Sequence, residues 1–472
     1  MNAPVSSLLD RFAQIVGPDN VIRDPEGMRP YLVEPRDRFV GRAPLILMPG
    51  SVGEVAAILA LADRTRTAVV PQGGNTGVVG GQIPRESGEE IVVALSRLNR
   101  VRAVDVDGNT MTVEAGVVLA DAQRAATAAG RLLPLALASE GSCQIGGNLS
   151  TNAGGTGVLA YGSARDLVLG LEVVLASGEV WDGLRTLRKD NTGYDLKSLF
   201  VGAEGTLGII TAAVLKLVPR PRGLAVAFFG VADPAAALGL LQVAQNRAGK
   251  DVTACEIIAR ICIDSVTRHV PGTRHPLAGR HDWYVLIEVS SGLSQEDADA
   301  AIEAIFTAAA DKGLVEDGVR AASIEQQQAF WRIRHALSEV QKHEGGSIKH
   351  DVAVPVSAVP EFLQRAGAAV VTLVPGARPF PFGHLGDGNI HFNVSQPPDM
   401  DRQAFLDRWD EVNAAVHAIA LDLGGTISAE HGIGRLKRDL LRQVKSPLEI
   451  DLMRRIKATL DPNGIMNPGK VL

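Results

Sequence analysis

The chain lacks histidine before His269, although ten histidines occur in its 472 residues. The first half therefore has no imidazole for catalysis, for metal binding or for covalent attachment of a cofactor. Aromatic residues make up only 4% of the sequence, and the charge balance is acidic, with 47 basic and 53 acidic residues. A nucleic-acid-binding protein would need a basic face and stacking rings, so nucleic acid is not an expected partner.

Cysteines and long apolar runs are also scarce. Cys143, Cys255 and Cys262 are odd in number and form no close-spaced motif, which excludes a disulfide framework and favours a reducing, cytoplasmic location. The N-terminal sequence MNAPVSSLLDRFAQIVG has no basic region before an apolar core, so it predicts an amphipathic helix and not a secretion signal. Asp233 and Pro234 interrupt the most apolar later stretch, 223–244, and no transmembrane span is expected.

Length and hydrophobic periodicity predict an α+β protein of two or three domains, at roughly 150 residues per domain. The cluster of Pro219, Pro221 and Gly223 marks a boundary between a first and a second half. The patterns predict helices at 53–66, 119–130, 235–247, 295–312, 324–343 and 401–423, and strands at 67–71, 91–95, 102–106, 111–116, 169–176, 208–218 and 282–290.

Glycine is abundant, with 50 residues. The segment VVPQGGNTGVVGG (69–81) places five glycines between positions 73 and 81, directly after a predicted strand. Such a loop can bring backbone N–H groups against a phosphate, although a series of tight turns would need the same residues. The segment has neither the G-K-[ST] ending of a nucleotide-hydrolysing loop nor the G-x-G-x-x-G of a dinucleotide fold.

A second glycine-rich segment is SEGSCQIGGNLSTNAGGTGVLAYG (139–162). Because two such loops can enclose a large ligand, this segment favours ligand binding over a series of tight turns. Ser142, Ser150, Thr151 and Asn152 carry hydroxyl and amide groups that could contact this ligand. A third segment, DNTGYDLKSLFVGAEGTLGII (190–210), adds another glycine turn that leads into a strand.

The second half contains two polar clusters. In PFGHLGDGNIHFNV (381–394), His384 and His391 would point to opposite faces of an ideal strand, but the glycines between them predict a turn that lets both rings converge. The segment GGTISAEHGIGRLK (424–437) supplies Glu430 and His431. Two imidazoles and one carboxylate can form a three-ligand divalent metal site, which would leave one histidine for proton transfer. The HExxH pattern of metalloproteases is absent.

The motifs PQGGNTGVVGG, GGNLSTNAGG, TGYDLKSLFVGAEGTLGII and LDPNGIMNPGKVL resemble those of FAD-binding oxidoreductases of the vanillyl-alcohol oxidase type. This resemblance implies an N-terminal helical segment (1–36), a two-part FAD-binding domain (37–220), an α/β cap domain for substrate (221–425) and a helical C-terminal segment (426–472) that contacts the flavin and completes the active site. The first loop would hold the flavin diphosphate, and the second would line the isoalloxazine and the ribityl chain.

The implied flavin contacts are distributed over these segments. They are Pro71, Gly73, Gly74, Asn75, Thr76, Gly77, Gly80, Gly81, Ser139, Gly141, Ser142, Gly146, Gly147, Ser150, Thr151, Asn152, Gly154, Gly155, Tyr161, Gly162, Glu204, Gly205, Gly208, Ile209, Ile210 and Asn467. Because no histidine precedes His269, and because Cys143 is better explained as a small packing residue than as a thioether link, FAD is expected to bind non-covalently.

The motifs GHLGDGNIHFN and SAEHGIGRLKRD are similar to those of the D-2-hydroxyglutarate dehydrogenases and related D-2-hydroxyacid dehydrogenases. The resemblance implies a divalent metal, expected to be Zn2+, on His384, His391 and Glu430, with His431 as the proton acceptor. It further implies that substrate contacts come from Arg334, Ser338, Lys349, Asn393 and His431. The family usually has threonine where Ser338 stands and tyrosine where His350 stands, which leaves the preferred acid open.

These residues also have simpler explanations. Arg334 and Ser338 are four apart, so they share a helix face that could be a solvated surface, and Lys349 could form a surface salt bridge with Asp351. An arginine and a lysine together suit a second carboxylate, which favours a dicarboxylic acid over lactate.

The expected function is the oxidation of D-2-hydroxyglutarate, and also of D-malate and related D-2-hydroxyacids, to the 2-oxoacid, with hydride passing to flavin N5. The expected electron acceptor is an electron-transfer flavoprotein or a quinone-linked carrier, and a homodimer is one expected assembly. The alternatives are a D-lactate or glycolate dehydrogenase of the same family, a zinc-dependent hydrolase that uses a metal-bound water, and a non-catalytic nucleotide-binding protein.

Overall fold

The computed structural model describes residues 7–472, which form two compact units. The first unit comprises residues 7–155, 163–220 and 430–472, and the second comprises 156–162 and 221–429. Residues 156–162 thus belong to the second unit, although they lie inside the range expected for the FAD-binding domain. No helix within residues 7–472 is long and apolar enough to span a membrane. The predicted N-terminal helix forms as α1 (Leu8–Val16), and residues 1–6 of that prediction lie outside the described residues.

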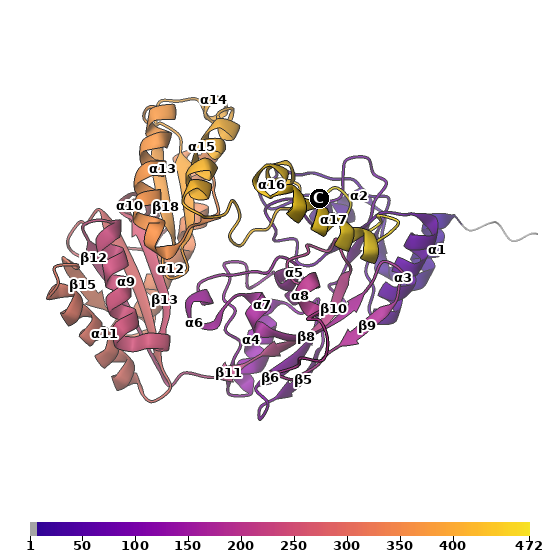
Figure 1. Ribbon diagram of the computed structural model, residues 1–472, viewed down its shortest axis with the longest axis horizontal. Helices are drawn as coiled ribbons and strands as arrows, with labels where there is room; N and C mark the ends of the chain where they lie inside the picture. The colour runs from indigo at the N-terminus through magenta and orange to yellow at the C-terminus, as the bar shows by residue number, and fades with distance from the viewer. Residues whose placement is uncertain (1–6) are drawn as a thin grey trace, which may run out of the picture. The chain divides into compact units, whose positions relative to one another are not determined.

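The first unit contains two main sheets (Figure 1). The smaller has the order β1-β2-β4-β3, and two of its three pairings are parallel, β2 with β4 and β3 with β4. The larger is antiparallel, with the order β5-β6-β10-β8-β9, and β7 pairs separately with β11. The strands are β1 (Val21–Ile22), β2 (Ile46–Leu47), β3 (Val69–Gln72), β4 (Ile91–Ala94), β5 (Val101–Asp105), β6 (Thr110–Glu114), β7 (Arg131–Leu132), β8 (Val168–Val174), β9 (Val180–Gly183), β10 (Ile209–Lys216) and β11 (Val218–Pro219).

Helix α3 covers the smaller sheet, because its buried residues Val55, Ile58 and Leu59 pack in one core with alternate residues of β3 and β4. Ser51 caps this helix by accepting a hydrogen bond from the Glu54 N–H. The helices of this unit, after α1, are η1 (Pro18–Asn20), α2 (Pro25–Leu32), α3 (Val52–Thr65), α4 (Leu119–Ala128), α5 (Ile145–Ser150), α7 (Ala164–Leu167), α8 (Lys197–Phe200), α16 (Arg438–Val444) and α17 (Pro447–Leu460).

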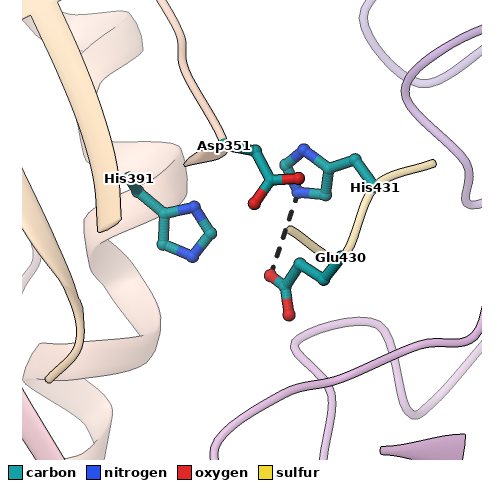
Figure 2. Close-up of side chains that lie close together, drawn as sticks. All are labelled: Asp351, His391, Glu430 and His431. Atoms are coloured by element: carbon teal, nitrogen blue, oxygen red, sulfur yellow. Dashed lines mark ion pairs between the residues drawn. The ribbon is translucent and has the colours of Figure 1, made fainter. Parts of the chain in front are cut away.

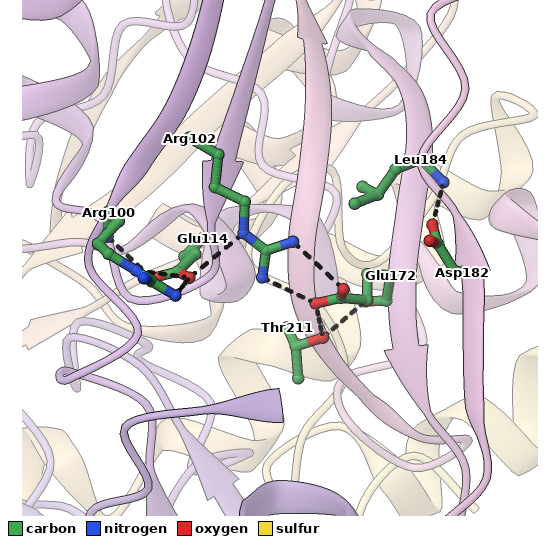
Figure 3. A network of polar contacts seen from close by, with 7 residues as sticks. All are labelled: Arg100, Arg102, Glu114, Glu172, Asp182, Leu184 and Thr211. Carbon is green, nitrogen blue, oxygen red and sulfur yellow. Dashed lines mark hydrogen bonds and ion pairs between the residues drawn. The ribbon is translucent and has the colours of Figure 1, made fainter. Parts of the chain in front are cut away.

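A ladder of charges crosses the larger sheet (Figure 3). The Arg102 guanidinium lies between two buried carboxylates, and its Nη2 is 3.0 Å from Glu172 Oε1 while its Nε is 3.2 Å from Glu114 Oε1. Arg100 also binds Glu114, and the Thr211 hydroxyl donates to Glu172 Oε1 at 2.7 Å. Each buried carboxylate therefore has a charged partner, which a buried charge requires.

The second unit is built on one antiparallel sheet with the order β15-β12-β14-β13-β18-β19-β16, to which β17 adds by pairing with β19. Its strands are β12 (Gly223–Val231), β13 (Val252–Ala259), β14 (Trp283–Ser291), β15 (Asp317–Arg320), β16 (Ser347–Ile348), β17 (Val352–Ala353), β18 (Arg378–His384) and β19 (Asn389–Ser395).

Helices cover both faces of this sheet (Figure 1). On β12, Ala227 and Phe229 face one core, which contains α9, α11, α13 and α15, whereas Val226 and Phe228 face the other, which contains α10 and α12. The helices are α6 (Val158–Tyr161), α9 (Pro234–Ala248), η2 (Gly249–Asp251), α10 (Arg260–His269), α11 (Gln295–Ala310), α12 (Ile324–Val340), η3 (Gln341–Glu344), η4 (Val356–Ala358), α13 (Val359–Leu373), α14 (Arg402–Leu406) and α15 (Trp409–Asp422).

One helix prediction is wrong in its extent. The segment 401–423 forms two helices, because α14 ends at Leu406 and α15 begins at Trp409. Neither glycine nor proline occurs at 407–408, so the sequence contains no signal for this break. Arg408 caps the second helix with its backbone, while its side chain binds the Leu373 carbonyl and Glu411.

Candidate functional site

The two long glycine loops contact each other inside the first unit. A Cβ at Gly74 would lie 2.0 Å from the Ser142 carbonyl oxygen, so only glycine permits this approach of the two backbones. The third segment joins them, since the Glu204 N–H donates to the Ser150 carbonyl at 2.8 Å. Three segments distant in the sequence therefore form one backbone-lined surface, as a phosphate-binding or flavin-binding site requires.

The C-terminal segment completes this surface. Residues 465–467 run beside β3, with the Val69 N–H donating to the Ile465 carbonyl and the Asn467 N–H donating to the Val69 carbonyl, both at 2.8 Å. The Asn467 amide group then donates to the carbonyls of Gly81 and Glu204, at 2.9 and 2.8 Å. Asn467 thus connects the first loop to the third segment, although nearly four hundred residues separate it from Gly81.

Several side chains that were expected to contact the flavin form hydrogen bonds within the protein, and their flavin contacts stay predictions. The Asn75 amide donates to the carbonyls of Pro30 and Val33 and accepts from Gln82. Asn152 Oδ1 accepts from the Ser163 hydroxyl and the Arg165 N–H. The hydroxyls of Ser142 and Thr151 donate to backbone carbonyls of their own loops. These four side chains hold the loops in shape, and the groups they leave for a ligand are largely backbone groups.

Two buried polar atoms fit a flavin. Gln144 Oε1 and Asn467 Oδ1 have no hydrogen-bond partner among residues 7–472, and both belong to the segments that form the surface. A buried acceptor without a donor is costly, and a flavin ring or ribityl chain offers N–H and O–H donors. Gln144 was missed by the sequence analysis, although it lies within the second glycine segment.

Cys143 lies buried beside Gln144, and burial raises the pKa of its thiol. A raised pKa reduces the fraction of thiolate and with it the nucleophilicity of the sulfur. This environment supports a packing role for Cys143.

The remaining predicted flavin residues occupy varied positions. Gly205 packs on Pro71, Ile209 and Ile210 are buried in β10, and Tyr161 lies in α6 of the second unit, where burial raises the pKa of its phenol. The others lie in the loops described, at Gly73, Thr76, Gly77, Gly80, Ser139, Gly141, Gly146, Gly147, Gly154, Gly155, Gly162 and Gly208.

Glu204 is a strained and buried residue of the third segment. Its φ is +51°, and its side chain accepts hydrogen bonds from the N–H groups of Ile433 and Gly434, at 2.7 and 2.8 Å. Burial raises the pKa of Glu204 to about 7, against the opposing effects of these two N–H donors and of Lys437. Glu204 therefore fixes the backbone that directly follows His431.

In the second unit, the β18–β19 hairpin brings two predicted metal ligands together. Phe382 pairs with His391 across the hairpin, so His384, two residues after Phe382, lies on the same face as His391. The two imidazole centroids are 5.7 Å apart. The glycine-rich turn at 385–388 makes this possible, because it reverses the chain between the two histidines.

Glu256 of β13 was not identified from the sequence. Its Oε1 lies 2.6 Å from His384 Nδ1, and its Oε2 accepts from Arg334 Nε, also at 2.6 Å. Burial raises the pKa of Glu256, but the Arg334 charge and His384 more than offset this and lower the pKa to about 2. The signal in the sequence was a single acidic residue within VTACEIIA, a strand whose residues are all buried.

A further carboxylate near His391 was also missed. Asp351 is buried, accepts a hydrogen bond from the Asn389 amide at 3.1 Å, and has a ligand atom within 4.8 Å of one on His391. In the first unit, His431 Nε2 lies 3.9 Å from Glu430 Oε1, and Glu430 Oε2 accepts from the Gly155 N–H at 3.0 Å. Figure 2 shows these two pairs of side chains with the Glu430–His431 ion pair dashed.

The predicted carboxylate-binding residues share one region of the second unit. Arg334 and Ser338 lie one turn apart on α12, and Lys349 Nζ donates to the Ser338 carbonyl at 2.8 Å. Arg334 is buried, with its guanidinium 5.0 Å from the centroid of the Phe382 ring. Because Arg334 is buried, the alternative of a solvated surface arginine does not apply; its two Nη groups donate no hydrogen bond among residues 7–472.

Asn393 is bound on both sides of its amide. Its Nδ2 donates to Gln341 Oε1 at 2.7 Å, and its Oδ1 accepts from the His350 N–H at 3.3 Å. These contacts favour a structural role over direct binding of substrate, and the predicted substrate contact of Asn393 stays a prediction.

Two family models match the chain. The model "FAD binding domain" matches residues 43–183, and the model "FAD linked oxidases, C-terminal domain" matches residues 220–471, more than half of the chain. The predicted domain boundaries at 36, 220 and 425 stay predictions.

Curated relatives match along nearly the whole chain. A mitochondrial D-2-hydroxyglutarate dehydrogenase from Arabidopsis thaliana is 38% identical, with 99% of this chain and 83% of the relative covered. A D-2-hydroxyglutarate dehydrogenase from Stutzerimonas stutzeri is 36% identical, with 98% of each covered.

Solved structures show the same fold at low sequence identity. A substrate complex of p-cresol methylhydroxylase superposes with a TM-score of 0.77 at 17% identity and covers 98% of this chain and 96% of that one. An alkyldihydroxyacetonephosphate synthase superposes with a TM-score of 0.75 at 18% identity, covering 99% and 86%. The predicted fold of the vanillyl-alcohol oxidase type is thus confirmed. The chain belongs to the family of FAD-linked oxidases that includes the D-2-hydroxyglutarate dehydrogenases.

Proposed function

We propose that this protein is an FAD-dependent dehydrogenase that oxidises D-2-hydroxyglutarate to the 2-oxoacid. The observation that carries the proposal is the similarity to D-2-hydroxyglutarate dehydrogenases along nearly the whole chain, with both flavin-oxidase domains present. The second unit supports it independently, because buried Arg334 and nearby Lys349 offer two cations to a carboxylate. D-Malate, a shorter dicarboxylate, is a further candidate substrate.

FAD would bind on the surface formed by the two glycine loops, the third segment and Asn467. Backbone N–H groups of the loops suit the diphosphate, and Gln144 Oε1 and Asn467 Oδ1 offer acceptors to flavin donors. No histidine lies in the sequence of these segments, so we expect the flavin to be released when the protein is denatured in acid.

A divalent metal would be held by His384, His391 and Glu430. Imidazole and carboxylate ligands suit Zn2+, and Asp351 offers a further oxygen ligand near His391. When bound, FAD would accept the hydride from C2 of the substrate and the metal would act as a Lewis acid on its hydroxyl.

Protein side chains would accept the proton and bind the substrate. His431 would accept the proton of the C2 hydroxyl, since imidazole has a natural pKa near neutrality. Arg334, Ser338 and Lys349 would bind the carboxylate at the far end of the substrate. Ser338 follows Arg334 by one turn of α12, and its carbonyl accepts a hydrogen bond from Lys349. Holding the substrate at both ends restricts its motion and aligns the reacting carbon.

The electron acceptor would be an electron-transfer flavoprotein or a quinone-linked carrier, and a homodimer is the proposed assembly. All three cysteines are free and buried, which suits a reducing compartment such as the cytoplasm.

The direct test is the absorbance spectrum of the purified protein before and after anaerobic addition of D-2-hydroxyglutarate. Flavin bands that bleach with the D-isomer, and not with the L-isomer, would support the proposal. Faster bleaching by D-lactate would favour the D-lactate or glycolate dehydrogenase instead. A colourless protein would favour a zinc-dependent hydrolase, and a yellow protein that no 2-hydroxyacid bleaches would favour a non-catalytic role.

A further inference from the structure

One buried carboxylate connects two parts of the proposed site in the second unit. Glu256 is 1% exposed and sits on β13, where it pairs directly with His384 on β18. Its two oxygens are used separately, one by His384 Nδ1 and the other by Arg334 Nε, each at 2.6 Å. The sheet register places the carboxylate between the two groups.

The contact with His384 determines which ring nitrogen can bind a metal. An ionised carboxylate only accepts hydrogen bonds, so Nδ1 of His384 must carry the proton and Nε2 is the nitrogen with a ligand lone pair. A carboxylate behind a ligating histidine fixes the tautomer and the ring orientation and raises the basicity of the ligand.

The contact with Arg334 determines the orientation of its guanidinium. The Arg334 Nε–H donates to Glu256, and the guanidinium carbon lies 5.0 Å from the centroid of the Phe382 ring. These two contacts fix the direction and the plane of the guanidinium. The two Nη groups then remain as the paired donors that suit a carboxylate. Phe382 is on the same strand as His384, two residues earlier.

We infer that Glu256 is a positioning residue that orients both the metal ligand His384 and the substrate-binding Arg334 through one shared carboxylate. The inference rests on the proposed function for the identity of the metal and of the substrate. It predicts that metal affinity and recognition of the distal carboxylate depend on the same side chain.

The test uses Glu256→Gln in the FAD-loaded protein. A glutamine has one acceptor oxygen, so it can satisfy only one of the two donors and presents an N–H2 to the other. After removal of bound metal, the Zn2+ dissociation constant is measured by competition with a chromophoric chelator. We expect it to rise by roughly 10–100-fold. In steady-state assays with saturating Zn2+, we expect KM to rise more for D-2-hydroxyglutarate than for D-lactate.

Glu288→Gln is the matched control. Glu288 lies on the neighbouring strand β14 and binds Thr253 and Trp331, at 2.7 and 2.8 Å, and not His384 or Arg334. We expect its Zn2+ affinity and its ratio of KM values to stay within about twofold of wild type, whereas a change equal to that of Glu256→Gln would overturn the inference.

A second variant tests the inference if Glu256→Gln does not fold, since that substitution leaves Arg334 buried without its counter-charge. The double variant Glu256→Leu with Arg334→Leu removes the pair together, which proteins often tolerate. It keeps His384 but removes its Nδ1 acceptor, so Zn2+ affinity should again fall by roughly 10–100-fold.

The outcomes separate this inference from the proposed function. If wild type binds Zn2+ tightly and both Glu256 variants bind it with unchanged affinity, the inference about Glu256 is overturned and the proposed metal site stands. No Zn2+ binding by wild type would overturn the metal site and the inference with it. A fall in metal affinity with equal KM changes for the two acids would refute the coupling to Arg334.

Discussion

Glu204 accepts a hydrogen bond from the backbone N–H of Gly434, with Oε2 and N 2.8 Å apart, although 230 residues separate the two. The other carboxylate oxygen accepts from the Ile433 N–H. The segment that carries Glu430 and His431 is therefore anchored to the third glycine segment of the same unit. This link gives Glu204 a role beyond the flavin contact expected from its motif.

We predict that Glu204→Gln slows flavin reduction by D-2-hydroxyglutarate by about tenfold, which corresponds to about 1.4 kcal/mol, and leaves FAD bound. The amide N–H2 would face one of the two backbone N–H groups, and an unsatisfied buried donor costs about 1–3 kcal/mol. That cost would loosen the segment next to His431. Stopped-flow flavin reduction measures the effect, with Glu26→Gln, at an exposed residue of α2, as the control. Equal rates in wild type and Glu204→Gln would contradict the anchoring role.

Glu204 should also make stability depend on pH. Its pKa is about 7 in the folded protein, against the ordinary 4.5 of a glutamate in the unfolded chain, so the folded state binds more protons between these two pH values. The free energy of unfolding should therefore fall as pH rises from 4.5 to 7, by about 3 kcal/mol from this group. Urea unfolding at pH 5 and pH 8 measures the change, and Glu204→Gln should remove that contribution. An unaltered pH dependence in the variant would refute the assignment.

Periodic segments of the fold could be predicted from the sequence. The strand expected at 91–95 is β4 (Ile91–Ala94), and the helix expected at 235–247 is α9 (Pro234–Ala248). Both have apolar patterns that match their buried faces. The break between α14 and α15 could not be predicted, because it coincides with a tertiary contact of Arg408 with the Leu373 carbonyl and not with a local turn residue.

The candidate site was predictable where a residue type carries its chemistry alone. Histidines in glycine-flanked turns identified His384 and His391 as candidate ligands. Glu256 could not be found in this way, because its role depends on strand pairing between β13 and β18, which brings together residues 128 apart. Asn75 has a role within the protein that the sequence did not indicate. A polar residue in a glycine loop predicts a contact with a ligand, but the Asn75 amide donates to the carbonyls of Pro30 and Val33.

The charge ladder of the larger sheet predicts an unequal response from two arginines. Arg102→Met would leave Glu172 without a cation and Glu114 with only Arg100, and losing one partner of a buried pair costs about 3–5 kcal/mol. Because 27% of the Arg102 side chain is exposed, we expect a loss near the lower end. Arg100→Met should cost less than Arg102→Met, since the Arg100 side chain is 71% exposed and exposed ion pairs contribute little to stability. Equal losses in thermal unfolding would contradict the proposed importance of Arg102.

Lys349→Met should affect a dicarboxylate more than a monocarboxylate. Removing one cation from the distal carboxylate should raise KM for D-2-hydroxyglutarate by about tenfold, which corresponds to about 1.4 kcal/mol. KM for D-lactate should change by less than about twofold. Lys342→Met is the control, because Lys342 is exposed in the neighbouring η3 helix and pairs only loosely with Glu339, at 3.7 Å. An equal rise for both acids would count against a distal-carboxylate site.

His431→Ala tests the proton acceptor. General-base catalysis contributes about 10²–10⁴-fold to rate, so flavin reduction by D-2-hydroxyglutarate should slow by at least about a hundredfold. FAD content should be unchanged, because the flavin surface does not include this side chain. His343→Ala, which removes an exposed histidine of η3 in the second unit, should reduce flavin at the wild-type rate. Rapid anaerobic mixing gives the rate of bleaching directly, and a wild-type rate in His431→Ala would assign the proton transfer to another group.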